Sequence, residues 1–301
     1  MYTRREFGLL ALSGMAAPSL GFAQKVAGVQ LGVQTYSFRE LPRAPGGDQT
    51  DAIVAAMKEC GLTECELWSP MIEPASPIVG RRPTPEEGQK VREDLRRWRI
   101  ETPLSYFQGI RKKFQSAGLS IPAYNYSFAE NFTDAEIERG FEMAKALGAT
   151  YITASSTLKV APRVAPFAEK HQMLVAMHNH SAVDNPNEFA SIASLEAALA
   201  MSKQFRINLD IGHFTAGNND PVAFLRARHA LITNLHIKDR KKNQGDNTPW
   251  GTGDTPIREV LQLLKREKWP IAAYIEYEHR GEGTPVAEVR KCLDHARQAL
   301  A

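Results

Sequence analysis

Short apolar runs alternate with amphipathic segments about eight times along the chain. Apolar runs of about four to eight residues are typical of buried strands, and longer segments with a period near 3.6 residues are typical of helices packed on a core. The predicted strands are Val29–Tyr36, Thr63–Trp68, Leu119–Tyr124, Thr150–Ser155, Met173–His178, Arg206–Asp210, Ile232–Ile237 and Ile271–Glu276. The predicted helices are Asp51–Cys60, Pro85–Trp98, Asp134–Leu147, Pro162–His171, Ser191–Lys203, Pro221–Arg228, Pro256–Glu267 and Pro285–Leu300.

Residues that favour helix ends stand at these boundaries. A Thr-Pro pair, with the hydroxyl as cap and the proline as first helical residue, is predicted to begin the helices at Thr84, Thr255 and Thr284. Capping boxes are predicted at Thr84–Glu87 and Thr133–Glu136. Glycines just past predicted helix ends, where a left-handed turn is needed, are Gly61, Gly118 and Gly148.

The repeated order of strand, loop and helix predicts parallel strands joined by right-handed crossovers. Eight such units close into an α/β fold of the (β/α)8 TIM-barrel type, whereas five or six would favour an open sheet. No glycine-rich phosphate fingerprint follows the first strand, which argues against a dinucleotide-binding fold. The second crossover is longer than the others because it contains the proline-rich segment Ser69–Arg82 and an extra helical pattern, Leu104–Ala117. We expect this insertion to overhang the barrel mouth.

The N-terminus has the parts of an export signal. Arg4 and Arg5 form a twin-arginine pair, the modestly apolar run Gly8–Ala17 follows, and the small-residue exit Gly21–Ala23 resembles a cleavage site. We therefore predict a signal peptide over residues 1–23, one barrel domain over residues 24–301, and a periplasmic location. The remaining chain is long enough for one barrel of about 250 residues, and we expect no membrane insertion after cleavage.

Composition narrows the class of protein. Apolar residues make up 43% and charged residues 24% of the chain, as in ordinary globular proteins, and the formal net charge is +3. That charge is far from the basic surface of a nucleic-acid-binding protein. The three cysteines, Cys60, Cys65 and Cys292, do not form a disulfide framework. Cys60 and Cys65 are close enough in sequence to pair in an oxidising compartment, but we expect all three to be buried apolar residues.

Polar side chains mark the ends of four consecutive predicted strands. His178, Asp210, His236 and Glu276 all have inward parity, so they are expected to meet at one end of the barrel. A divalent cation is the usual way to offset the cost of burying carboxylates there. Mixed histidine and carboxylate ligands suit manganese, zinc, cobalt or iron. Each residue also has a structural alternative, with Asp210 as a helix N-cap, His236 as a hydrogen-bonded core histidine and Glu276 as an ion-pair partner.

Three motifs resemble the sugar phosphate isomerase/epimerase family of xylose-isomerase-like barrels. They are Asn208–His213, His236–Asp239 and Ile275–Glu276, and the glycine-rich segment Trp250–Asp254 fits the same pattern. The resemblance covers the chain from Gly32 to Glu276. It implies a metal ion held by Asp210, His236 and Glu276, with His213 and Lys238 near the substrate. It also implies a fourth ligand at the end of the fifth strand, where the sugar 3-epimerases of the family have a catalytic glutamate.

This sequence departs from that pattern, because His178-Asn179-His180 stands where the family often has Glu-Asn-His. Two interpretations stay open. His178 replaces the glutamate as metal ligand, or Glu188 reaches back from the following loop. Strand parity favours His178.

Further residues have candidate roles in catalysis and substrate binding. His180 and His213 are imidazoles suited to exchanging protons near neutral pH, together with Glu276 as a base, and Lys238 is suited to stabilising an oxyanion. Glu66 is a candidate contact to substrate hydroxyls, and the candidates for stacking against a sugar are Trp68 and Trp250. The alternatives are a solvated lysine for Lys238, a helix cap or ion pair for Glu66, and ordinary packing for the two tryptophans.

These observations support three hypotheses of function. The first is a metal-dependent isomerase or epimerase that moves a proton through an enediolate on a non-phosphorylated sugar or keto-sugar. The second is a lyase, hydratase or hydrolase that acts on a 3-keto-glycoside by metal-assisted elimination. The third is a non-catalytic sugar-binding barrel. The basic run Arg240–Lys242 is either a phosphate contact or a solvated loop. The expected partner is a small carbohydrate rather than a nucleic acid, and the oligomeric state is left open.

Overall fold

The computed structural model describes residues 25–43, 47–78 and 81–301. The predicted export signal, residues 1–23, lies outside these described residues. Within the described ranges, none of the helices has the length and apolar character needed to cross a membrane.

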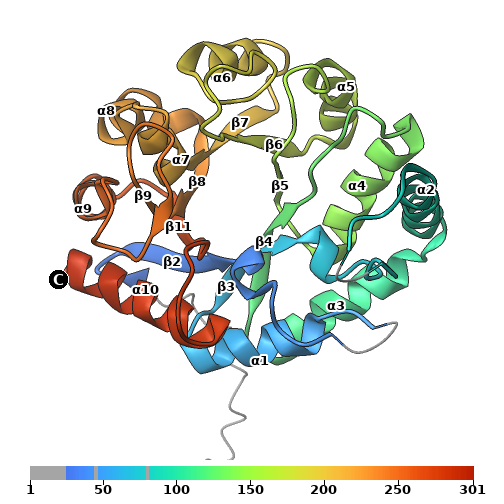
Figure 1. Cartoon of the computed structure of the whole chain (residues 1–301), viewed down its shortest axis with the longest axis horizontal. Helices are drawn as coiled ribbons and strands as arrows, with labels where there is room; N and C mark the ends of the chain where they lie inside the picture. The colour runs from blue at the N-terminus through green and yellow to red at the C-terminus, as the bar shows by residue number, and fades with distance from the viewer. Residues whose placement is uncertain (1–24, 44–46, 79–80) are drawn as a thin grey trace, which may run out of the picture.

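Eight parallel strands form a closed barrel surrounded by helices (Figure 1). The barrel strands are β2 (Val29–Gln34), β3 (Glu64–Trp68), β4 (Ser120–Asn125), β5 (Tyr151–Ala154), β6 (Leu174–His178), β7 (Phe205–Asp210), β8 (Ile232–Ile237) and β11 (Ala272–Ile275). The ring closes because β2 pairs with both β11 and β3. Every predicted strand is present, so the predicted (β/α)8 barrel is confirmed.

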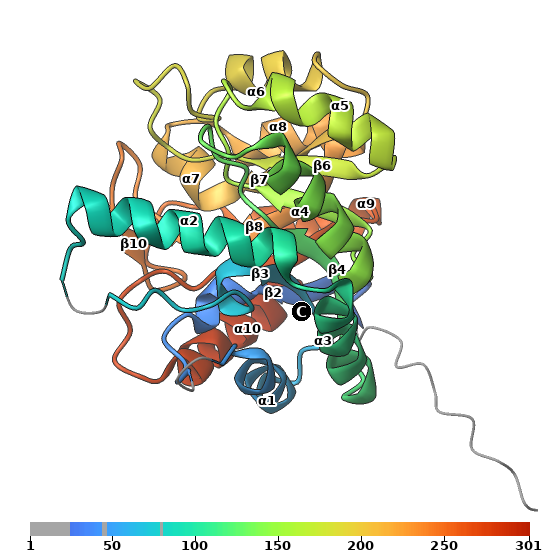
Figure 2. The ribbon, with the colours of Figure 1, turned by 90° about the vertical axis from the view of Figure 1, so that its right-hand side faces the viewer.

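The helices form the outer layer of the molecule (Figures 1 and 2). They are α1 (Thr50–Cys60), α2 (Pro85–Glu101), α3 (Leu104–Ser116), α4 (Asp134–Leu147), α5 (Ala161–His171), α6 (Ile192–Leu199), α7 (Ile211–Ala216), α8 (Pro221–Arg228), α9 (Ile257–Glu267) and α10 (Pro285–Leu300). Short elements complete the description: β1 (Lys25–Val26), β9 (Asp239–Arg240), β10 (Asn247–Thr248) and the 3-10 turns Thr35–Phe38, Ser69–Met71 and His229–Leu231. All predicted helices are present, and α7 is an additional one that the sequence pattern did not predict.

The predicted helix ends are confirmed with one exception. Both capping boxes form, and Thr284 caps α10. The exception is Thr255, whose hydroxyl accepts a hydrogen bond from the Arg240 backbone N–H, so that α9 begins one residue late, at Ile257. The three predicted turn glycines all have positive φ: Gly61, Gly118 and Gly148.

The helical part of the insertion in the second crossover, α3, packs against α1 and α4 in the outer ring, contrary to the prediction that it overhangs the barrel mouth. Figure 1 shows α2 in the outer ring, where it packs beside α4. A buried ion pair attaches α2 to the loop after β3, because Arg99 Nε and Nη2 donate to the Glu73 carboxylate at 2.8 and 2.9 Å. This attachment explains why the segment lies against the barrel wall.

The barrel wall has an apolar outer side and a polar inner side. Leu209 and Leu235 belong to the apolar core beneath the helices, whereas the alternating residues Asn208 and His236 are hydrogen-bonded to each other inside the barrel. This alternation directs polar side chains from neighbouring strands toward one another. Cys60, Cys65 and Cys292 are buried free thiols, as expected.

Candidate metal centre and active site

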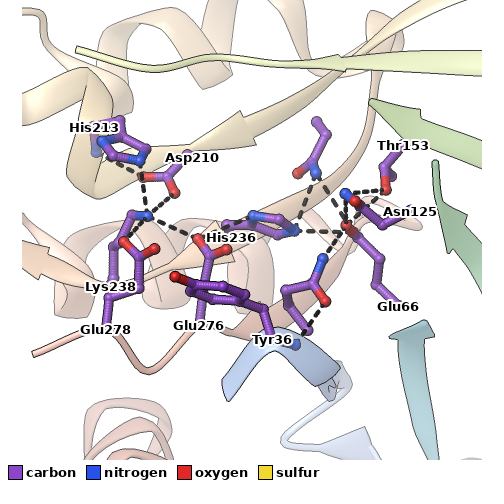
Figure 3. A network of polar contacts seen from close by, with 12 residues as sticks. Tyr36, Glu66, Asn125, Thr153, Asp210, His213, His236, Lys238, Glu276 and Glu278 are labelled. Carbon is purple, nitrogen blue, oxygen red and sulfur yellow. Dashed lines mark hydrogen bonds and ion pairs between the residues drawn. The ribbon is translucent and has the colours of Figure 1, made fainter. Parts of the chain in front are cut away.

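The ends of four neighbouring strands bring together four side chains that can ligate a metal ion. His178 ends β6, Asp210 ends β7, His236 lies in β8, and Glu276 directly follows β11. All four are buried, and one nitrogen or oxygen atom of each lies within 4.8 Å of those of the other three. The structure thus places the four residues singled out by strand parity in one cluster, three of which are labelled in Figure 3.

Unpaired polar atoms show that this cluster fits a cation. Nδ1 of His178, Nδ1 of His236 and Oδ2 of Asp210 are buried without a hydrogen-bond partner. Two of these atoms are in ionic contact, because His236 Nδ1 lies 3.2 Å from Glu276 Oε2 and Asp210 Oδ2 lies 2.9 Å from Lys238 Nζ. Buried polar atoms are normally hydrogen-bonded, so the three atoms together leave ligand capacity for a further partner. Two imidazoles and two carboxylates are a donor set that manganese, zinc, cobalt and iron accept.

Asp210 has two roles that use different oxygen atoms. Its Oδ1 caps α7 by accepting a hydrogen bond from the His213 backbone N–H at 2.6 Å. Its Oδ2 remains directed at the cluster, 2.9 Å from Lys238 Nζ but outside hydrogen-bonding geometry. Asp210 therefore caps a helix, which was the structural alternative, and also keeps one oxygen atom directed at the cluster, as predicted for a metal ligand.

Glu66 lies beneath the cluster and not in the cavity, which contradicts its predicted contact with substrate. Its side chain has no exposed surface. Its carboxylate accepts hydrogen bonds from Gln34 at 2.6 Å, Thr153 at 2.6 Å, Asn125 at 2.9 Å, Asn234 at 3.1 Å and Asn208 at 3.4 Å. It also lies 2.9 Å from Nε2 of His236 (Figure 3).

The contact with Glu66 orients the imidazole of His236. Because Nε2 faces this carboxylate, Nδ1 is the nitrogen left for a cation, and such a carboxylate partner fixes the ring of a metal-binding histidine. Burial by itself lowers the pKa of His236, but Glu66 and Glu276 outweigh burial and raise the pKa well above its ordinary value. When no cation is bound, the two carboxylates therefore favour the protonated ring of His236.

Lys238 is buried inside the same cluster, which excludes a solvated lysine. Its Nζ lies 2.9 Å from Asp210 Oδ2, 2.8 Å from Glu276 Oε2 and 2.6 Å from Glu278 Oε2 (Figure 3). Three carboxylates thus share one ammonium group. The positive charge of Lys238 therefore offsets part of the negative charge of these carboxylates, a role that the sequence analysis gave to a metal ion alone.

The two ligand carboxylates respond differently to this environment. Burial raises the pKa of Asp210 to about 7, and Lys238 only partly opposes that shift. Burial also acts to raise the pKa of Glu276, but Lys238 and His236 outweigh it and hold that pKa well below its ordinary value. At neutral pH, Glu276 is therefore ionised, and Asp210 is the carboxyl group that retains a proton in part.

Glu188 pairs with a histidine instead of joining the ligand cluster. Its Oε2 lies 2.9 Å from Nδ1 of His180. His180 is partly exposed and lines the cavity, so the pair leaves its Nε2 available on that side. Of the two alternatives for the fourth ligand, the geometry favours His178.

His213 lies between two cationic side chains. Its Nε2 is 2.9 Å from Lys238 Nζ, and its Nδ1 is 2.6 Å from an Arg240 guanidinium nitrogen. Burial and the charge of Lys238 hold its pKa well below the ordinary value, so the ring is neutral. Gly212 permits this packing, because a Cβ at that position would lie 2.5 Å from Lys238 Cγ and 2.8 Å from the Lys238 carbonyl oxygen.

A cavity of about 190 Å³ opens above the cluster. His178, His180, His213 and Lys238 line it on one side, and Tyr36 and Trp68 line it as well. The rings of Tyr36 and Trp68 meet edge to face with centroids 4.8 Å apart. Trp68 therefore lies where the sequence predicted a sugar contact, whereas Tyr36 and Glu278 were not predicted as site residues.

Trp250 does not line this cavity. It belongs to a neighbouring cavity, where its ring meets His295 edge to face at 6.0 Å. The glycine-rich segment turns away from the metal cluster because Asp239 holds it: the backbone N–H groups of Gly251 and Gly253 donate to Asp239 Oδ2 at 2.8 and 2.9 Å. Trp250 therefore lies outside the cavity above the cluster, and its contact with a sugar stays a prediction.

Residues 29–299 match the model of the xylose isomerase-like TIM barrel family. The chain belongs to this family. Membership agrees with the resemblance inferred from the three sequence motifs. Among curated proteins, the chain is similar to L-ribulose-5-phosphate 3-epimerase of Salmonella paratyphi A, at 30% identity over 97 residues. That match covers 32% of this chain and about a third (34%) of the relative's length.

Several solved structures share the fold over nearly the whole chain. The 3-keto-D-glucoside 4-epimerase of E. coli has a TM-score of 0.61 at 13% identity, covering 90% of this chain and 99% of that one. The IolI protein with a bound zinc atom has a TM-score of 0.62 at 15% identity, covering 90% and 97%. A probable 3-DHS dehydratase of Bacillus anthracis has a TM-score of 0.61 at 16% identity, covering 88% and 98%. At such low sequence identities, the structural similarity to these proteins establishes the fold alone.

Proposed function

We propose that this protein is a divalent-metal-dependent isomerase or epimerase of a non-phosphorylated sugar or keto-sugar. The observation that carries the proposal is the buried cluster of His178, Asp210, His236 and Glu276, whose ligand atoms lie within 4.8 Å of one another and include three that make no hydrogen bond. A divalent cation held there would polarise a substrate carbonyl and make a neighbouring C–H more acidic. The zinc atom in the IolI structure supports the choice of cofactor.

The residues around the cavity are suited to moving a proton. His180 has Nδ1 paired with Glu188, which orients the ring, so its Nε2 is placed to accept a proton from a substrate in the cavity. Lys238 and His213 line the same cavity, and a substrate oxygen atom that binds to either would replace one of their present contacts. Glu278, on the far side of Lys238, is a second carboxylate close enough to exchange a proton. His180 follows β6 and Glu278 follows β11, three strands apart around the barrel, so the two groups approach the cavity from different directions.

The contacts of the basic run after β8 favour an uncharged substrate. Arg240 is buried, and its guanidinium bonds to His213, Ser181 and the Gly245 carbonyl. Lys241 pairs with Asp254 at 3.3 Å. These cations are engaged within the protein, so they do not form a phosphate site in this cavity. A non-phosphorylated substrate also fits the export that the N-terminal sequence predicts.

The second candidate is a lyase or dehydratase acting on a 3-keto-glycoside. His178 replaces a carboxylate at the end of β6, so the cavity does not have the symmetrical pair of glutamates expected for a two-base epimerase. An elimination needs one base to remove a proton and one acid to assist the leaving group, and the His180–Glu188 pair with Lys238 suits that chemistry. The dehydratase among the structural relatives is consistent with this candidate.

Deuterium exchange distinguishes the two candidates. The protein, loaded in turn with manganese, zinc or cobalt, is incubated in deuterium oxide with a panel of free ketoses and 3-keto-glycosides. An isomerase or epimerase incorporates deuterium next to the carbonyl of the recovered sugar, whereas a lyase releases an unsaturated product or an aglycone. If no sugar exchanges deuterium and none is cleaved with any metal, both enzymatic candidates fail, and a sugar-binding barrel is left.

A further inference from the structure

A second cavity of about 570 Å³ lies beside the catalytic cavity, along α10. A third cavity, of about 480 Å³, shares lining residues with each of the other two. Glu278 lines both the catalytic and the third cavity, whereas Pro249, His279 and Arg280 line both the third and the outer cavity. Through these shared residues, the three cavities adjoin one another in a row from the candidate metal site to Trp250, and we call this row the groove.

The walls of the outer cavity suit an uncharged ligand with many hydroxyl groups. Trp250 offers an aromatic surface, and Gln298 and Asp294 offer exposed hydrogen-bonding groups. Lys291 is neutralised by Glu288 at 2.8 Å. The lysine and arginine that line this cavity do not outnumber its acidic residues. The cavity therefore lacks the positive charge that a phosphate or carboxylate ligand requires.

The wall formed by residues 247–250 has hydrogen-bonding capacity that the protein does not use. Asn247 Oδ1, Thr248 Oγ1 and Trp250 Nε1 are buried and have no partner. Asn247 lines the third cavity and Trp250 the outer one. Unpaired buried polar atoms carry a free-energy cost, which a hydroxyl-rich ligand that reached Asn247 or Trp250 would reduce.

We propose that the groove is a second sugar subsite, so that the substrate is a glycoside whose reacting keto-sugar ring occupies the catalytic cavity and whose second ring packs against Trp250. This inference rests on the proposed function, because it places the reacting ring at the metal cluster. It gives Trp250 the carbohydrate contact that the sequence suggested, but at a subsite beyond the small cavity.

The test compares a one-ring and a two-ring probe by isothermal titration calorimetry on the metal-loaded full chain. The probes are the methyl glycoside of 3-keto-glucose and the corresponding 3-keto derivative of methyl maltoside. The two-ring probe is expected to bind about tenfold more tightly than the one-ring probe, and Trp250→Ala is expected to remove most of that advantage without changing the affinity for the one-ring probe. Gln298→Ala, at an exposed position on α10, is expected to reduce the advantage a few-fold, and it provides a second variant if Trp250→Ala does not fold.

Trp269→Ala is the matched control, because Trp269 precedes β11 at the opposite end of the barrel, where it stacks on His229. This variant should keep the full preference for the two-ring probe. Two results overturn the subsite: the native protein binds both probes with equal affinity, or Trp250→Ala lowers the affinity for both probes equally. If the one-ring probe still exchanges deuterium in either case, the proposed function stands. If neither probe binds or exchanges, both the subsite and the proposed function on keto-glycosides fail.

Discussion

His236 depends on a carboxylate that does not reach the cavity. Glu66 is buried below it and accepts hydrogen bonds from side chains of neighbouring strands, so its own position is fixed. Partners of this kind orient a metal-binding imidazole and make it a better ligand. The candidate site therefore extends one layer deeper into the barrel than the residues that line the cavity.

Replacing Glu66 by glutamine is expected to weaken metal binding by about 10- to 100-fold while the barrel stays folded. The amide keeps the shape of the side chain but removes the charge that supports His236. Affinity is measured by competition with a chromophoric chelator, and folding by circular dichroism. Glu64→Gln is the control, since Glu64 lies two residues earlier in β3 and contacts Tyr274 instead of His236. Equal metal affinities in the two variants would contradict the role of Glu66.

Metal affinity is also expected to rise with pH through the neutral range. The raised pKa values of His236 and Asp210 mean that both groups hold protons in the metal-free protein, and a cation must displace them. Below these pKa values, protons compete with the metal, and above them the competition ends. Calorimetric titrations in two buffers of different ionisation enthalpy measure the protons released. A dissociation constant that does not change with pH, with no proton release, would contradict this assignment.

Strand parity predicted the ligand cluster but not the residues around it. His178, Asp210 and His236 have directions fixed by the alternation of their strands, so their convergence followed from the sequence. The depth of Glu66 along the barrel axis depends on the register between strands, which the sequence does not reveal. The positions of Glu188 and Trp250 depend on loop paths, and each lies away from its predicted location.

Among the secondary-structure elements, the eight strands and the longer helices followed from hydrophobic periodicity. Helix α7 did not, because its six residues are too few to show a period, and its cap is the candidate ligand Asp210. Thr255 resembled a helix cap, but a tertiary hydrogen bond to the Arg240 backbone uses its hydroxyl. Sequence patterns within a segment therefore did not predict its structure where the segment is short and is held by residues distant in the sequence.

The buried ion pair that attaches α2 is expected to be costly to break. Arg99→Ala leaves the buried carboxylate of Glu73 without its partner, which should lower the free energy of unfolding by about 3–5 kcal/mol. Urea denaturation measures the change. Arg97→Ala, which removes an exposed arginine of the same helix, should change stability by less than about 0.5 kcal/mol. A loss of under about 1 kcal/mol for Arg99→Ala would show that this pair does not hold the insertion in place.

For the molecule as a whole, the barrel joins the four ligand-bearing strands in one hydrogen-bonded ring. Neighbouring strands fix the relative positions of the ligands, so the site is assembled by the fold itself. We propose that this domain folds before it leaves the cytoplasm, since the twin-arginine pattern at Arg4-Arg5 marks a route for folded proteins.

Export is tested by cell fractionation. The full chain, expressed in a bacterium with a twin-arginine pathway, is expected in the periplasmic fraction with residues 1–23 removed. Replacing Arg4 and Arg5 by lysine should retain it, unprocessed, in the cytoplasm. A periplasmic product that does not depend on the two arginines would contradict the proposed route.

The most direct test of the metal centre is anomalous diffraction from crystals of the protein loaded with zinc or manganese. We expect one anomalous peak per chain, with ligand distances of about 2.0–2.3 Å to His178, Asp210, His236 and Glu276. If Lys238 still bridges Asp210 and Glu276 in metal-loaded crystals and no ion lies among the four residues, the lysine is the resident cation and the proposal of a metal-dependent enzyme is wrong.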